Sequence, residues 1–84
     1  MLKKGIFKQL RRTVDAVESA PTALQALAAA RELRLAAEAL ELSLVVEIRS
    51  QRGTWTEIGQ VYGTSKQGAQ QRFRAAVEQA RANA

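Results

Sequence analysis

The feature that most constrains this chain is a long stretch, residues 22–52, that contains neither glycine nor proline. Alanine and leucine dominate it, and both have high helix propensity. The stretch therefore predicts a long helix over residues 21–51, although a break near 34–38 stays open. Pro21 suits the first turn of this helix, and Thr22 with Gln25 forms an alternative capping pair.

The segments on either side of this stretch also read as helices. An apolar stripe with spacings of three and four residues predicts an amphipathic helix within residues 1–20; its members are Leu2, Ile6, Leu10, Val14 and Val17. Residues that interrupt or end helices are concentrated at 53–73. This segment holds four of the five glycines, together with the single Trp and Tyr. The chain is therefore expected to be all-α, as a single domain over residues 1–84.

Glycines and capping residues divide residues 54–82 into two helices. Gly53 is expected to end the long helix as its C-cap. Thr54 or Thr56 can cap a helix over 54–62, and Glu57, three residues beyond Thr54, would complete a capping box. Gly63 suits a left-handed turn, and Ser65 can cap a last helix that ends near residue 81. A short helix, a tight turn and a longer helix follow the layout of a helix-turn-helix.

Charge is distributed unevenly along the chain, whose net charge is +5. Residues 1–12 carry five cations and no acid, residues 13–50 carry three cations and six acids, and residues 51–84 carry five cations and two acids. Basic ends favour a polyanionic partner.

Residue usage argues against an enzyme. The chain has no Cys and no His, so disulfides, thiolate metal sites and the commonest general base are excluded. No cofactor or metal is expected. The sequence shows neither a membrane-spanning run nor a secretory signal, which favours the cytoplasm. The basic, amphipathic start of the chain leaves contact with an anionic membrane surface as a less favoured reading.

The stretch "TWTEIGQVYGTSKQGAQQRF" resembles the helix-turn-helix of small bacterial DNA-binding regulators of the actinobacterial, phage or plasmid type, which are related to homeodomain-like and sigma-factor region 4-like modules. The likeness covers about residues 53–74 and is carried by Trp55, Glu57, Ile58, Gly59, Gly63, Ser65, Gln67, Arg72 and Phe73. It implies a DNA-binding module. Two residues depart from the pattern: Thr64 replaces an aliphatic residue, and Gly68 replaces Ala.

The predicted reading surface lies on the helix that starts at Ser65. Glutamine pairs with adenine and arginine with guanine, so the base-reading candidates are Gln67, Gln70, Gln71 and Arg74. The phosphate candidates are Thr54, Ser65 and Lys66, and additional DNA backbone contacts are expected from Arg72, Lys3, Lys4 and Lys8. Arg72 has two further candidate partners, a stack on Trp55 and an ion pair with Glu57.

Several apolar residues are assigned to the core or to a dimer interface. Ile58 and Val61 are expected to pack against Leu44, Ile48 and Phe73, while Gly59 lets the last helix approach closely. The long helix is apolar on two sides between residues 40 and 48, and a chain this short has a thin core. A homodimer is therefore expected, with dimer or core residues Leu33, Leu40, Leu44 and Ile48.

The sequence predicts a protein that binds duplex DNA sequence-specifically in the major groove, most simply a transcriptional repressor. A non-specific architectural factor of a phage or plasmid remains open. So does a helix-turn-helix that contacts RNA polymerase or another regulator through acidic residues of the long helix. An antitoxin-like module, whose first helix wraps a protein partner, is a further alternative.

Overall fold

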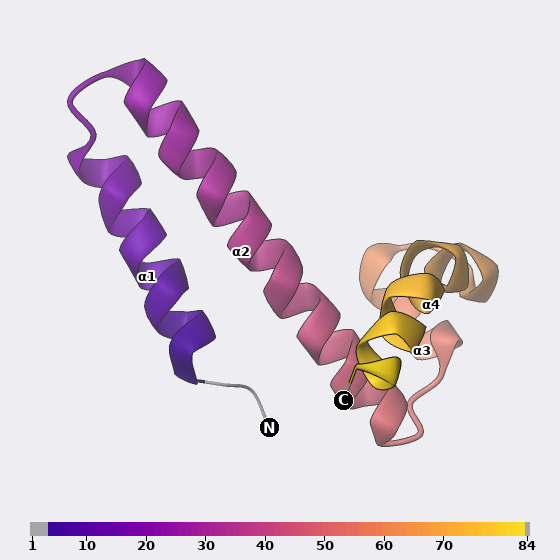
Figure 1. The fold of residues 1–84 in the computed structure, drawn as a ribbon. Helices are drawn as coiled ribbons and strands as arrows, with labels where there is room; N and C mark the ends of the chain where they lie inside the picture. The colour runs from indigo at the N-terminus through magenta and orange to yellow at the C-terminus, as the bar shows by residue number, and fades with distance from the viewer. Residues whose placement is uncertain (1–3, 84) are drawn as a thin grey trace. The chain divides into compact units, whose positions relative to one another are not determined.

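A computed structural model describes residues 4–83, and within them the chain is all-α, with four helices and no strand (Figure 1). The helices are α1 (Lys4–Ser19), α2 (Ala23–Ser50), α3 (Trp55–Tyr62) and α4 (Lys66–Ala82). The long central helix is unbroken through residues 34–38. None of the helices in the described part of the chain is both long and apolar enough to span a membrane.

The chain divides after Glu41 into two compact units. The N-terminal unit contains α1 and the first part of α2, which form a hairpin (Figure 1). The start of α2 is fixed by Thr22, whose hydroxyl accepts the Gln25 backbone N–H at 3.1 Å and donates to the Gln25 side chain at 3.0 Å. This capping pair is confirmed, and Pro21 precedes the helix instead of occupying its first turn.

The N-terminal unit has little core of its own. Within its described residues only Ala36 is buried, with 5% of its surface exposed, and α1 buries no residue. Leu33 and Leu40 are half-buried. Five larger apolar side chains remain exposed, namely Phe7, Val14, Leu24, Leu27 and Leu35. This unit therefore leaves apolar surface that its own residues do not cover.

The C-terminal unit packs the end of α2 against α3 and α4 around one apolar cluster. The buried members are Val45, Trp55, Ile58, Ala69, Phe73 and Val77, and the half-buried Leu42, Val46, Ile48 and Tyr62 surround them. The rings of Tyr62 and Phe73 lie 5.4 Å apart, in the range of favourable aromatic pairs. This cluster holds the two short connections of the unit in place.

Two expected core residues face away from this cluster. Val61 is 78% exposed, because the inner face of α3 is formed by Trp55, Ile58 and Gly59. Leu44 is 42% exposed, and its neighbour Val45 enters the core instead. The expected packing of Ile58, Ile48 and Phe73 is confirmed, whereas the placement of Val61 and Leu44 in this core is wrong.

The end of α2 differs from the expected glycine C-cap. Arg52, not Gly53, adopts the left-handed conformation, with φ of 68°. Arg52 N–H donates to the Arg49 carbonyl at 3.2 Å and Gly53 N–H to the Ile48 carbonyl at 2.7 Å, which together form a Schellman motif. A Cβ on Gly53 would collide with Ile48, so glycine is needed there for space and not for a positive φ.

Candidate nucleic-acid interface

The first helix of the pair, α3, begins with a complete capping box. Thr54 Oγ1 accepts the Glu57 backbone N–H at 3.1 Å, and the Glu57 carboxylate accepts the Thr54 backbone N–H at 2.8 Å and its hydroxyl at 3.0 Å. The pKa of Glu57 lies below its usual value because these hydrogen bonds, first the backbone one, favour the carboxylate. The capping prediction is confirmed, and the Thr54 hydroxyl already donates its hydrogen within the protein.

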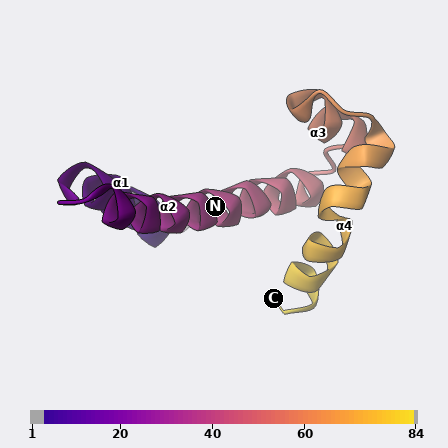
Figure 2. The ribbon, with the colours of Figure 1, turned by 90° about the horizontal axis from the view of Figure 1, so that it is seen from above.

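The turn between α3 and α4 depends on two glycines. Gly63 has φ of 66° and ends α3, as expected, and Thr64 N–H closes the turn on the Gly59 carbonyl at 2.8 Å. A Cβ on Gly59 would lie 2.7 Å from the Thr64 carbonyl oxygen and 2.8 Å from that of Ser65. Gly59 therefore allows the backbone of the turn, more than α4 itself, to lie against α3. The axes of α3 and α4 run in clearly different directions (Figure 2).

Thr64 and Gly68, the two residues that depart from the helix-turn-helix pattern, lie against each other. A Cβ on Gly68 would collide with the Thr64 Oγ1 atom, and this hydroxyl donates to the Ser65 carbonyl at 3.1 Å. Glycine at position 68 therefore makes room for the threonine in the turn. The two departures compensate for each other inside the protein.

The second helix, α4, separates its buried residues from its polar ones. Ser65 caps it by accepting the Gly68 N–H at 3.1 Å, an interaction that keeps the hydrogen of its own hydroxyl for another acceptor. Ala69, Phe73 and Val77 face the core at spacings of four residues. Lys66, Gln67, Gln71 and Arg74 are exposed and Gln70 is half-buried.

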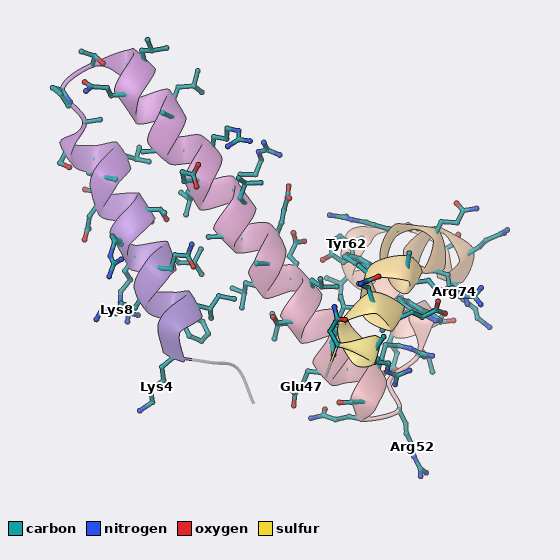
Figure 3. All side chains as sticks on the ribbon, in the orientation of Figure 1. Lys4, Lys8, Glu47, Arg52, Tyr62 and Arg74 are labelled. Atoms are coloured by element: carbon teal, nitrogen blue, oxygen red, sulfur yellow. The ribbon has the colours of Figure 1, made fainter. Side chains whose placement is uncertain are left out.

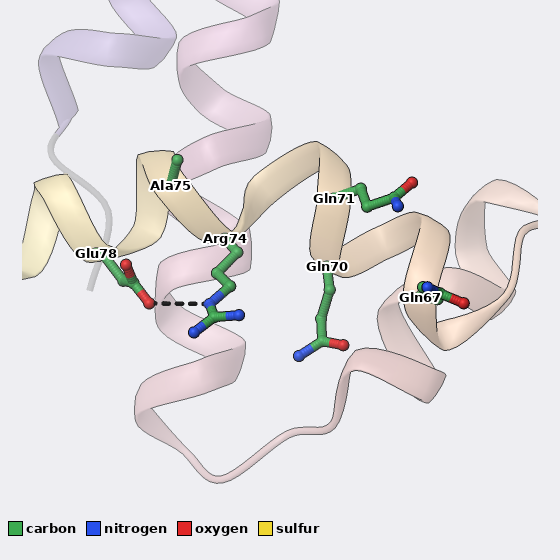
Figure 4. Close-up of a pocket in the computed structure, with 6 residues that line it drawn as sticks. All are labelled: Gln67, Gln70, Gln71, Arg74, Ala75 and Glu78. Atoms are coloured by element: carbon green, nitrogen blue, oxygen red, sulfur yellow. Dashed lines mark hydrogen bonds and ion pairs between the residues drawn. The ribbon is translucent and has the colours of Figure 1, made fainter.

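The four predicted base-reading side chains come together on one face of α4. Gln67, Gln70, Gln71 and Arg74 line a shallow surface hollow with Ala75 and Glu78 (Figure 4). Arg74 Nε donates to Glu78 Oε1 at 3.1 Å, an ion pair between two exposed side chains. Glu78 was not among the predicted site residues, although its i, i+4 spacing from Arg74 is a recognisable signal.

Two arginines of the C-terminal unit stack on aromatic rings. The Arg72 guanidinium carbon lies 4.5 Å from the centre of the Tyr62 ring and 4.9 Å from that of Phe73. The expected partners of Arg72, Trp55 and Glu57, were therefore wrong: Glu57 is engaged in its capping box.

Trp55 instead stacks with Arg49, which was not among the site residues predicted from the sequence. Its guanidinium carbon lies 4.7 Å from the ring centre, and its Nη1 donates to the Gly53 carbonyl at 2.9 Å. Its position in the last turn of α2 pointed only to an interaction with helix carbonyls.

The basic residues near the N-terminus belong to the other unit. Lys4 and Lys8 extend from α1 (Figure 3) and are exposed, while Lys3 lies outside the described residues. Among residues 4–83 there is no group of His, Cys, Asp and Glu side chains that could hold a metal ion.

No protein family, curated protein or solved structure matches this chain. The likeness of residues 53–74 to small bacterial helix-turn-helix regulators therefore stays a prediction that rests on its own residues.

Proposed function

We propose that this protein binds duplex DNA sequence-specifically, with α4 in the major groove. The observation that carries this proposal is the division of α4 into two faces. Ala69, Phe73 and Val77 anchor one face in the core, while the glutamines and Arg74 are gathered on the other. An α-helix fits the major groove, and glutamine and arginine match the hydrogen-bonding edges of adenine and guanine.

The phosphate contacts proposed around α4 differ in how available their side chains are. Ser65 and Lys66 lie at the start of α4, and both are exposed. The Ser65 hydroxyl accepts a hydrogen bond from the protein and can donate one to a phosphate oxygen. The Thr54 hydroxyl donates to Glu57, so its role is to fix the start of α3 more than to contact DNA.

We further propose that the protein acts as a homodimer and represses transcription by covering promoter DNA. The N-terminal unit exposes apolar side chains that its own residues do not cover, and we propose that a second copy of the chain covers them. Leu24, Leu27 and Ala28 border a shallow apolar hollow on α2 together with Arg31 and Arg34. Arg31 pairs with Glu32 at 3.4 Å and Arg34 with Glu38 at 3.3 Å. A surface with charges of both signs beside an apolar hollow can complement a second copy of itself.

Selection of the purified protein against random duplexes at physiological salt tests the DNA-binding proposal. Enrichment of an inverted repeat is the expected result, because a two-fold dimer reads two equivalent half-sites. Binding without enrichment would contradict sequence-specific reading and favour an architectural factor. Absence of binding would overturn the proposal and favour a protein-binding helix-turn-helix.

A further inference from the structure

A second, more polar cleft lies within the C-terminal unit beside the proposed reading face. Its volume is about 280 Å³, and it is bordered by three arginines: Arg49 from α2 and Arg74 and Arg81 from α4. Trp55 and Val77 supply apolar parts of its lining. Gln70, Arg74 and Glu78 line both this cleft and the hollow of the reading face, so the two are neighbours along α4.

The side chain of Arg49 is held in position at this cleft before any ligand binds. Its guanidinium stacks on Trp55 and donates one hydrogen bond to the Gly53 carbonyl. Trp55 is itself 6% exposed and fixed in the core. A guanidinium has five N–H donors, so this arrangement leaves most of them for other acceptors. Prior ordering lowers the entropy that binding an anion would cost.

The cleft has an excess of positive charge. Glu78 is the only acidic residue that lines it, and this carboxylate bonds to Arg74. Neither Arg49 nor Arg81 forms an ion pair within the described residues. Two guanidinium groups therefore border the cleft without an acidic partner, a composition that suits a phosphate group.

We propose that this cleft holds a phosphate of the DNA backbone, contacted by Arg49 and Arg81. This inference rests on the proposed placement of α4 in the major groove. A helix with its side chains is about 10–12 Å wide and the groove about 12 Å, so side chains beside the reading face meet the sugar-phosphate wall. Arg74 borders both hollows, and its charge is already paired with Glu78. Arg49 and Arg81 thus set the depth and orientation of α4, and the bases are read by other residues.

The test compares the salt dependence of binding to one fixed duplex, measured by fluorescence anisotropy, for wild type, Arg49→Gln, Arg81→Gln and the double variant. Each lost phosphate contact is expected to reduce the slope of log K against log salt by about 0.9. Base preference, measured on a set of duplexes with single base-pair changes, is expected to stay unchanged. Arg12→Gln is the matched control, because it removes one exposed cation of α1 that is assigned neither to DNA contact nor to the hollow proposed for a second copy.

Three further outcomes separate the possible failures. If wild type binds DNA but the slopes of Arg49→Gln and Arg81→Gln equal that of the Arg12→Gln control, the cleft assignment alone is overturned. Altered base preference in Arg81→Gln would also overturn it, since the residue would then read bases. A wild type that fails to bind DNA at low salt would overturn both proposals. Arg49→Lys keeps the charge, so comparing it with Arg49→Gln distinguishes lost charge from lost stacking on Trp55. Thermal melts by circular dichroism check that each variant folds; Arg81 is exposed and is not a member of the core cluster.

Discussion

At the scale of single residues, the turn between α3 and α4 leaves no room for a side chain at Gly59. The position where a Cβ would stand lies 2.7 and 2.8 Å from two backbone carbonyl oxygens, and backbone cannot move aside as a side chain can. Gly59→Ala is expected to destabilise the C-terminal unit by about 1–3 kcal/mol. Urea denaturation followed by circular dichroism measures this loss.

The same substitution at Gly5 provides a matched control. Gly5 also lies in a helix, but nothing stands within 4 Å of its Cβ position. Gly5→Ala is expected to stabilise α1 by about 0.5–1 kcal/mol, since alanine loses less backbone entropy. If Gly59→Ala is as stable as wild type, the backbone of the turn does not collide with a Cβ at this position.

Thr64 and Gly68 are expected to be coupled in stability. Gly68→Ala alone collides with the Thr64 hydroxyl, whereas in the Thr64→Ala background the nearest neighbours are the Cβ of residue 64 at 3.4 Å and the Ser65 hydroxyl at 3.5 Å, which are ordinary van der Waals contacts. The second case is expected to gain up to about 1 kcal/mol from helix propensity. A double-mutant cycle should give a coupling energy of about 0.5–3 kcal/mol. Additive effects of the two substitutions would contradict the compensation inferred from the structure.

At the scale of helices, the start of α3 depends on the ionisation of Glu57. Its folded pKa is lowered, so its contribution to stability is fully present above the ordinary value of 4.5 and is lost as pH falls through the folded pKa. Glu57→Gln keeps a capping side chain that does not titrate. We expect wild type to lose more stability than this variant between about pH 6 and pH 3. If the urea midpoints of wild type and Glu57→Gln fall equally over this pH range, the ionised carboxylate does not stabilise the start of α3.

Helix boundaries were predictable because their signals are local. Thr22, Thr54, Gly63 and Ser65 each act within four residues of their own position, and each acts as expected. The left-handed Arg52 was missed because glycine, which stands next to it, is the usual residue for that conformation.

Tertiary contacts were less predictable than boundaries. Helical spacing alone allowed Leu44 or Val45 to face the core, and only packing against α3 and α4 selects Val45. The partners of Arg49 and Arg72 likewise depend on distances between helices that no local pattern encodes. The four residues predicted to read bases lie on one face of α4 because they follow the i, i+3, i+4, i+7 spacing of a helix, while their contact with DNA stays a prediction.

At the scale of the whole molecule, the proposed dimer predicts a change in mass on mutation. Leu24→Glu places a charge in the apolar surface of the N-terminal unit and is expected to convert a dimer into a monomer of 9.2 kDa. Glutamate is favourable in the first turn of a helix, so α2 should remain intact. Light scattering coupled to size-exclusion chromatography measures the mass.

Val61→Glu is the control for this experiment. Leu24 and Val61 are both 78% exposed, but Val61 belongs to α3 of the C-terminal unit and is not part of the proposed interface. The Val61→Glu variant should keep the mass of wild type. A wild type that is already monomeric at micromolar concentration would overturn the dimer proposal.

The division of α4 into a buried row and an exposed row also bears on how such a protein can change over generations. Ala69, Phe73 and Val77 maintain the fold, while Gln67, Gln71 and Arg74 do not enter the core cluster. Substitutions in the exposed row can therefore accumulate without unfolding the protein. A library randomised at these three positions should yield mostly folded proteins, so a lineage or a laboratory could vary the surface proposed to read DNA while the scaffold stays constant.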